Sequence, residues 1–253
     1  MLQKAIEYIM KQAKPNEITY EGEMFTDKVM HRMHQPISAE TIQMKTLSSL
    51  IDYLRDNSDT ILEGKAIVQV VSPTCVKLFS QKSLEKDLEN KIYVDVKAEI
   101  PEFAFGKWYG NEEFVINVMS KFITTSFEEG LDDKAAVLQF AGTVQAGTVT
   151  NYGDNGVSQS ATIKTGILDM EEKLVPSIVE LCPYRTFNEV EQPKSKFIFR
   201  MKQDKYDGIN CALFEADGGA WRNEAMQNIK CYLVSELEKI KENLKELEVT
   251  VIA

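Results

Sequence analysis

Histidine and cysteine are scarce in this sequence. Among 253 residues there are two histidines, His31 and His34, and four cysteines, at positions 75, 182, 211 and 231. The cysteines form no CxxC pair and show none of the spacings used by zinc ribbons. The histidines are three residues apart in a region that alternates like a strand, which would place them on opposite faces. We therefore expect no metal and no cofactor, and we expect all four cysteines to be reduced.

Long apolar runs and a positive overall charge are also missing. The longest apolar runs are far shorter than the roughly 20 residues that span a bilayer, and the first 14 residues lack the continuous apolar core of a signal peptide. The formal net charge is −10 at pH 7, which argues against broad, non-specific attraction to nucleic acid, although a local basic patch can survive on an acidic protein. We expect a cytoplasmic protein without a membrane partner.

Catalytic signatures are absent as well. Two histidines leave little for a Ser-His-Asp arrangement. Carboxylates are numerous, with 39 Asp and Glu, but no pair among them stands out as a general acid and base. We therefore predict no catalytic residue and no enzyme.

What the sequence does contain is typical of a folded domain of mixed class, with 43% hydrophobic and 27% charged residues. Apolar spacing and β-branched runs predict a single α+β domain over residues 1–253, with a mostly antiparallel, β-rich middle and flanking helices. The placement of residues 1–35, read as a helix and a hairpin turning at 26–28, stays open. The expected helices cover residues 2–13, 38–56, 111–127 and 222–246, and the expected strands include 65–80 and 91–101.

A glycine-rich stretch, GTVQAGTVTNYGDNGVSQSATIKTG at residues 142–166, is the best candidate for a phosphate loop. Gly142 and Gly147 have the first spacing of a nucleotide-binding P-loop, but Thr148 stands where the lysine is needed. Apolar and polar residues alternate on both sides of NYGDNG, which predicts an antiparallel hairpin with its turn within Tyr152–Gly156. The alternative is a loop whose amides contact an anion.

The segment after residue 221 carries a helical apolar seam. A four-three-four-three spacing joins Leu233, Leu237, Ile240, Leu244 and Leu247, and the tail EVTVIA adds Val249 and Val251 on an expected final strand. We predict that this longest helix helps to make subunit contacts. Packing on the protein's own sheet is the equally weighted alternative.

Two further stretches, NYGDNGVSQSATIKTG and VELCPYRTFNEVEQPKSKFIFRM, carry a family likeness. Together they resemble an uncharacterised phage and prophage family that includes the YfdQ protein of enterobacterial prophages. The matching positions are Gly156–Gln159, Pro183–Phe187, Glu191–Pro193 and Phe197–Arg200. The resemblance implies a phage or prophage origin and a bacterial host cell as the setting, without implying an activity.

The second of these stretches is also the most basic. Lys194, Lys196, Arg200 and Lys202 would share one face of a strand while Phe197 and Phe199 take the other. Arg185 has Glu189 and Glu191 close in sequence as possible partners, and Lys107 with Trp108 forms a second cation–aromatic pair. These residues are candidates for contacts with a ligand or nucleic acid, whereas a buried structural ion pair is the alternative for Arg185.

Two functions follow from these observations. The first is a non-enzymatic phage protein that works as a homo-oligomeric structural or interaction assembly. The second is a nucleic-acid or nucleotide-binding accessory protein of phage recombination, replication or counter-defence.

Overall fold

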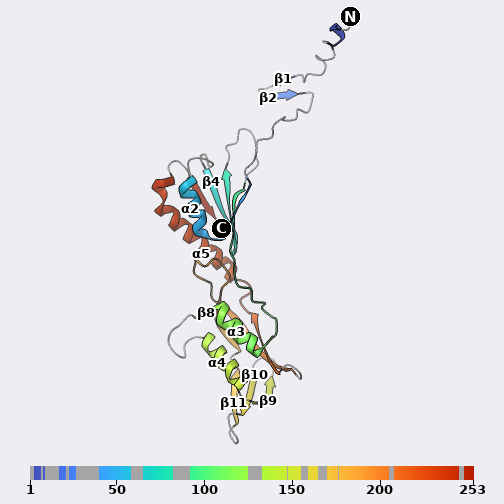
Figure 1. Ribbon diagram of the computed structural model, residues 1–253, viewed down its shortest axis with the longest axis vertical. Coiled ribbons are helices and arrows are strands. Elements are labelled where there is room, and N and C mark those ends of the chain that lie inside the picture. The colour runs from blue at the N-terminus through green and yellow to red at the C-terminus, as the bar shows by residue number, and fades with distance from the viewer. Residues whose placement is uncertain are drawn as a thin grey trace. The chain divides into compact units, whose positions relative to one another are not determined.

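The computed structural model describes residues 3–6, 8, 17–20, 23–26, 40–57, 65–81, 92–124, 133–146, 148–154, 159–164, 170–175, 177–204, 208–244 and 248–253 (Figure 1). Contacts between Cα atoms divide the chain into two units, residues 1–40 and 41–253. His31, His34 and Leu247 lie outside the described residues. Predictions that involve these three residues therefore stay predictions.

The first unit contains a short helical segment and one hairpin. Residues 3–6 are helical, and β1 (Glu17–Tyr20) pairs with β2 (Glu23–Thr26) in antiparallel register. Tyr20 is paired with Glu23, so the chain reverses between them, and our expected turn at residues 26–28 was wrong. The observed hairpin is shorter than the predicted one, whose second strand would lie outside the described residues.

The second unit begins with a mixed sheet in the order β15-β4-β5-β6-β3. Its outer strands, β15 (Glu248–Ile252) and β3, run parallel to their neighbours, and the other pairs are antiparallel. The remaining elements of this layer are β3 (Ile42–Met44), α2 (Leu47–Asn57), β4 (Lys65–Ser72), β5 (Cys75–Gln81), β6 (Ile92–Lys97), α5 (Trp221–Lys239) and the 3-10 helix η1 (Lys241–Leu244). The helix expected to start at Ser38 is thus shorter, because Ile42 belongs to a strand.

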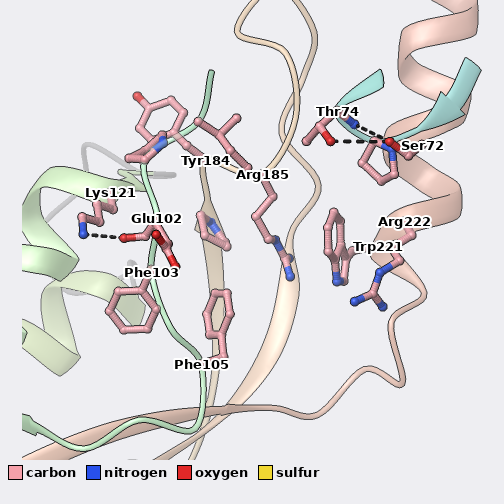
Figure 2. Close-up of a pocket in the computed structure, with 14 residues that line it drawn as sticks. Ser72, Thr74, Glu102, Phe103, Phe105, Lys121, Tyr184, Arg185, Trp221 and Arg222 are labelled. Carbon is pink, nitrogen blue, oxygen red and sulfur yellow. Dashed lines mark hydrogen bonds between the residues drawn. The ribbon is translucent and has the colours of Figure 1, made fainter. Parts of the chain in front are cut away.

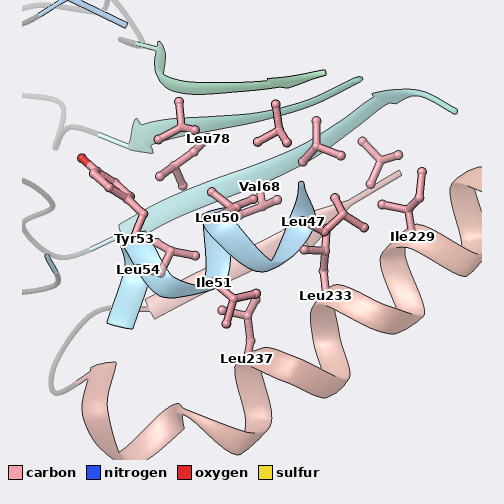
Figure 3. Close-up of a cluster of buried hydrophobic side chains, with 14 of the residues drawn as sticks. Leu47, Leu50, Ile51, Tyr53, Leu54, Val68, Leu78, Ile229, Leu233 and Leu237 are labelled. Carbon is pink, nitrogen blue, oxygen red and sulfur yellow. The ribbon is translucent and has the colours of Figure 1, made fainter. Parts of the chain in front are cut away.

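The first hydrophobic core lies between this sheet and the helices α2 and α5 (Figure 3). Helix α2 contributes side chains at helical spacing, and β4 contributes every second residue, as a strand with one buried face must. Ile51 of α2 lies beside Leu237 of α5, while Leu50 lies on the sheet side of α2 beside Val68. The fully buried members include Leu47, Leu50, Leu54, Val68, Leu78, Val94, Ile229 and Leu233.

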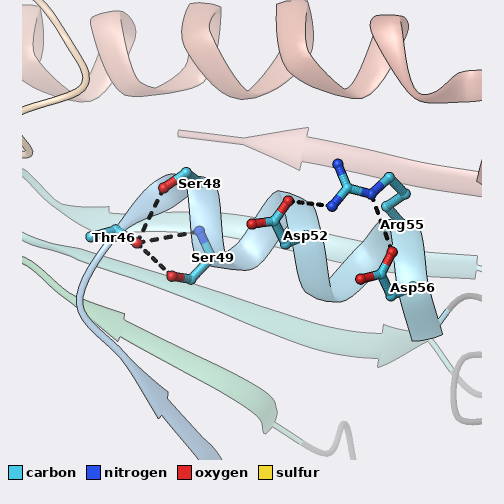
Figure 4. Close-up of polar contacts among 6 residues, drawn as sticks. All are labelled: Thr46, Ser48, Ser49, Asp52, Arg55 and Asp56. Atoms are coloured by element: carbon cyan, nitrogen blue, oxygen red, sulfur yellow. Dashed lines mark hydrogen bonds and ion pairs between the residues drawn. The ribbon is translucent and has the colours of Figure 1, made fainter.

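Helix α2 is capped at its amino end by two different side chains. Thr46 Oγ1 accepts a hydrogen bond from the Ser49 backbone amide at 3.3 Å (Figure 4). Glu189, which is 142 residues away in sequence, accepts one from the Leu47 amide at 2.8 Å. A carboxylate at this position satisfies amides that have no partner within the helix and opposes the positive end of its dipole.

The second hydrophobic core lies under an antiparallel sheet in the order β7-β14-β13-β12-β8. Helices α3 (Asn111–Lys121) and α4 (Asp133–Ala146) cover one face of this sheet, and Phe114 of α3 stacks on Phe199 with ring centroids 5.5 Å apart. The strands are β7 (Tyr109–Gly110), β8 (Phe122–Ile123), β12 (Ile178–Pro183), β13 (Ser195–Asp204) and β14 (Gly208–Glu215). The helix expected over 111–127 ends at Lys121, because the next two residues enter β8.

A small antiparallel sheet contains most of the glycine-rich stretch. Strands β9 (Thr148–Asp154), β10 (Gln159–Lys164) and β11 (Met170–Val175) pair in the order β11-β10-β9. The antiparallel hairpin is confirmed, with Gln159 paired to Asp154. Two details were wrong. Residues 142–146 are helical because α4 continues through them, and Tyr152 and Gly153 belong to the strand rather than to the turn.

The carboxyl-terminal helix is confirmed as the longest described helix, although it covers residues 221–239 rather than 222–246. Leu233, Leu237, Ile240 and Leu244 are buried in the first core, and Val249 and Val251 pack against it. The structure therefore favours the second of our two alternatives for this seam, packing on the protein's own sheet. The final strand pairs with β4 of the same chain.

These elements confirm the α+β class, with helices flanking sheets that are mostly antiparallel. Within the described part of the chain, no helix combines the length and apolar character needed to cross a bilayer.

Candidate functional site

Strand β13 carries the basic residues that the sequence singled out. Its alternation is as expected: Phe197, Phe199 and Met201 are buried under α3 and α4, while Arg200 and Lys202 belong to the opposite face. On the paired strand, Phe214 lies directly across from Ile198 and therefore shares that face. The sheet thus presents cations, an aliphatic residue and an aromatic ring on the side away from its helices.

A cavity of about 530 Å³ opens on this face. Its aromatic wall is made by Trp108 and Phe214, whose ring centroids are 6.0 Å apart. Lys202 Nζ lies 4.6 Å from the centroid of the Trp108 ring, close enough for a cation–π contact. We call the residues that line this cavity the β13 face. They are Trp108, Gln159, Ile198, Arg200, Met201, Lys202 and Phe214.

The small sheet is joined to the β13 face by one buried glutamine. Gln159 of β10 accepts a hydrogen bond from the Met201 amide at 3.0 Å and donates one to the Met201 carbonyl at 3.3 Å. These bonds attach β10 to the edge of the cavity. In the sequence, Gln159 belongs to a predicted strand and to one of the stretches that carry the family resemblance, but neither feature predicts this contact.

Three of the predicted ligand residues come together in the cavity, and four do not. Trp108, Arg200 and Lys202 line it. Lys107 instead places its Nζ 4.6 Å from the centroid of the Tyr109 ring. The other three lie elsewhere: Lys194 and Lys196 are exposed outside the cavity, and Arg185 is buried in a separate site.

Arg185 is the centre of that second site (Figure 2). Its side chain is only 6% exposed, and its Nη1 donates to Glu215 Oε1 at 3.0 Å. Its Nη2 donates to Ser195 Oγ. Burial lowers the pKa of Arg185 to about 10, although the carboxylates of Glu215 and Asp217 act to raise it. Neither of the possible partners Glu189 and Glu191 pairs with Arg185, because its carboxylate partner, Glu215, is the last residue of β14.

Aromatic rings surround this guanidinium group. Its carbon lies 4.1 Å from the Trp221 ring centroid and 5.5 Å from that of Phe197. Arg222 stacks on the same Trp221 ring at 4.8 Å, and Figure 2 shows the indole between the two arginines. Trp221 Nε1 donates to Glu215 Oε1 at 3.2 Å, so the carboxylate fixes both the arginine and the indole.

The chain around Arg185 is held by the buried side chain of Gln192. Its Oε1 accepts from the backbone amides of Arg185 and Thr186, at 2.9 and 3.1 Å, and its Nε2 donates to the Phe187 carbonyl at 2.8 Å. A loop in the protein interior must satisfy its backbone groups, and one amide side chain with two donors and an acceptor does so here. This network gives a structural reason for the motif PYRTFNEVEQP.

Asp217 completes the polar network. Ser195 Oγ donates to its Oδ2 at 2.7 Å, and the Gly219 amide donates to its Oδ1 at 2.9 Å. Burial raises the pKa of Asp217, but the hydrogen bonds from Ser195 and Gly219 together with the charge of Arg185 outweigh it, so the pKa is lowered from 3.8. The ionised form is therefore favoured in the folded protein.

We expect Asp217→Asn to remove a pH-dependent part of the stability. A carboxylate whose folded pKa is depressed stabilises the fold above its unfolded pKa, near 3.8, and loses this contribution as the pH falls through the folded value. The difference in melting temperature between wild type and variant should therefore be largest above pH 5 and shrink below pH 4. Glu238→Gln, on the exposed side of α5, is the control. A difference that stays constant from pH 6 to pH 3 would contradict the assignment.

No group of three His, Cys, Asp or Glu side chains within the described ranges is placed to hold a metal ion. All four cysteines are free; Cys182 and Cys211 are buried, and burial raises the pKa of Cys211 to about 12. Cys75 is half-buried and Cys231 is exposed.

Comparison of the chain with protein-family models, with curated proteins and with solved structures finds no match.

Proposed function

We propose that the protein binds single-stranded nucleic acid on the β13 face. The observation that supports this is the cavity in which Trp108 and Phe214 lie beside Arg200 and Lys202. Proteins that bind single strands combine cations that follow the backbone with aromatic rings on which bases stack. A sheet face offers both together because alternate residues of a strand point the same way.

Duplex recognition has less support in this geometry. The residues that line the cavity belong to strands and to the segment before β7, and none of the helices in the described part of the chain contributes to it. Reading a major groove usually requires a helix or a two-stranded ribbon that enters it. The cavity instead has the size of a pocket for one or two planar groups, which fits unstacked bases.

The net charge of −10 shapes how such binding would behave. Repulsion between the acidic surface and the phosphates weakens binding outside the β13 face. At the β13 face, Arg200 and Lys202 offset this repulsion. Affinity should therefore be moderate and should fall steeply with salt. Each phosphate neutralised on a single strand contributes a slope of about −0.7 to the plot of log K against log salt.

The test is fluorescence anisotropy of labelled 20-nucleotide oligo(dT) and oligo(rU) at 50 and 200 mM salt. Trp108→Ala should weaken binding by about 5- to 150-fold, which corresponds to the roughly 1–3 kcal/mol of one lost stacking contact. Lys202→Gln should weaken binding and reduce the salt slope by about 0.7. Lys107→Ala removes a neighbouring cation that does not line the cavity, so its affinity should match wild type.

Circular dichroism melting of each variant separates loss of binding from loss of folding. The proposal is overturned if neither oligonucleotide binds at 50 mM salt. It is also overturned if a folded Trp108→Ala variant binds as tightly as wild type.

The biological setting that we propose follows from the resemblance described above. In a phage or prophage context, a protein that binds single strands would act in the cytoplasm of the bacterial host. It would be an accessory protein of recombination, replication or counter-defence.

A homo-oligomeric assembly is the second candidate, and strand β15 is the observation that favours it. This strand is the last in the order of its sheet, so one of its edges has no partner among the described strands. Val249 and Val251 pack on the chain's own core, while Glu248, Thr250 and Ile252 are exposed on the opposite face of the strand. Edges of this kind can pair with a second copy. A light-scattering mass equal to one chain of 28.7 kDa at micromolar concentrations would overturn this candidate.

A further inference from the structure

The Arg185 site includes a second cavity, of about 350 Å³, that the proposed function does not use. It lies where the loop after β4, the segment before β7, the start of α5 and the Arg185 loop meet (Figure 2). Its volume is at the lower end of the range for small-molecule pockets. A ligand of one ring system and one attached group would fill it.

The cavity walls combine rings, hydroxyl groups and cations with the carboxylate of Glu102. Phe103, Phe105 and Trp221 supply flat apolar surfaces, and Arg222 and Lys121 supply charge. Ser72 and Thr74 bring hydroxyl groups from the turn between β4 and β5. Ligand sites typically show this pattern, a mainly apolar lining with a few polar groups that fix orientation.

Two features of the guanidinium groups indicate an anionic ligand. Among the described residues, Arg222 has no carboxylate partner, and its only side-chain contact of note is the Trp221 ring. Arg185 is 95% buried, and within the same described part of the chain its Nε has no hydrogen-bond acceptor. Buried donors are nearly always satisfied, so an unsatisfied one at the wall of a cavity is compatible with a missing acceptor.

The start of α5 adds to the positive potential. Trp221 and Arg222 are the first two residues of this 19-residue helix and both line the cavity. Ala220, at the N-cap, makes no side-chain capping hydrogen bond. The amides of Ala220, Arg222 and Asn223 already donate to backbone carbonyls, so this helix start contributes its dipole, in the same direction as Arg222, rather than free amides.

We propose that this cavity binds a small aromatic anion of the nucleoside monophosphate class. The base would pack against the rings of Phe103, Phe105 and Trp221, and the phosphate would lie at Arg222 and the start of α5. Ser72 and Thr74 would be placed for the sugar hydroxyls. None of these residues lines the β13 face, so the site is independent of the function proposed above.

Tryptophan fluorescence provides a direct measurement. The chain has two tryptophans, so Trp108→Phe leaves Trp221 as the sole emitter, in contact with the proposed ligand. Titration of this variant with AMP, GMP, CMP and UMP at pH 7 should change Trp221 emission in a saturable way for at least one of them. Isothermal titration calorimetry of the wild-type protein should return the same dissociation constant.

Variants and simpler ligands test each part of the proposed site. Arg222→Gln should weaken nucleotide binding at least tenfold and leave binding of the matching nucleoside unchanged. Lys241→Gln, which removes the same charge from the 3-10 helix after α5, should have no effect. Inorganic phosphate should bind much more weakly than the nucleotide, because it lacks the ring.

The inference is overturned if none of the four nucleotides binds at 5 mM. It is also overturned if Arg222→Gln binds nucleotide like wild type, or if phosphate alone binds as tightly as the nucleotide. Because Trp108→Ala tests the β13 face and Arg222→Gln tests this cavity, failure of one leaves the other measurable.

Discussion

Glu215→Ala is expected to lower the free energy of unfolding by about 3 kcal/mol, the low end of the range for breaking a buried ion pair. Arg185 would be left buried at 6% exposure without its carboxylate, and Trp221 Nε1 would lose its acceptor. Glu215 itself is 31% exposed, so water screens part of the loss. Urea unfolding followed by circular dichroism measures the change.

Replacing Arg185, the other member of the ion pair, should cost less stability than replacing Glu215. Arg185→Met replaces the buried charge with an apolar side chain of similar length, and Glu215 can be hydrated at its exposed edge. This variant should therefore be more stable than Glu215→Ala. Combining both changes should recover part of the loss caused by Glu215→Ala alone. Glu238→Ala, an exposed glutamate of α5, should be near neutral.

An Arg185→Met variant less stable than Glu215→Ala would contradict this account. Arg185 would then stabilise the fold mainly through its stacking on Trp221 and Phe197 rather than through the ion pair.

Gln192→Ala should cost about 3 to 5 kcal/mol. The amides of Arg185 and Thr186 would each lose their acceptor in a buried loop, and an unsatisfied buried group costs roughly 1–3 kcal/mol. The cavity left by the side chain adds to this cost. Thermal and urea unfolding measure the change, with Gln203→Ala on the exposed part of β13 as the matched control.

Gln192 also has an effect at a distance, because its loop carries Phe187 and Val190 into the first core. Protection of the α2 amides in hydrogen exchange should therefore fall together with stability. A variant that unfolds at the wild-type urea concentration would show that water replaces the lost acceptor.

Much of the fold could be predicted because it depends on local patterns. The β13 alternation and the burial of Leu233 and Leu237 follow directly from residue spacing. Our prediction of a strand at residues 143–146 was wrong. Thr143 and Val144 are β-branched and fit an alternating pattern, yet they continue a helix that begins ten residues before Thr143. Helix ends are decided by such continuity as much as by propensity.

The candidate sites were less predictable because they depend on strand pairing. Trp108 reaches Lys202 only because β7, which begins at Tyr109, lies beside β14, and no spacing in the sequence encodes that neighbour. Arg185 likewise finds its carboxylate 30 residues away rather than at Glu189, which caps α2 instead. Proximity in sequence was a poor guide wherever a partner lay on another strand.

The order of the elements along the chain has a consequence for folding during synthesis. The first core is built from α2 and β4–β6, then from α5 and β15, and the whole antiparallel sheet with α3 and α4 is encoded between these two parts. On the ribosome the intervening segment can therefore fold while the first core still waits for α5 and β15, which close it. During this interval the apolar faces of α2 and β4 are exposed, so we expect the first core to be the part most prone to aggregation during synthesis.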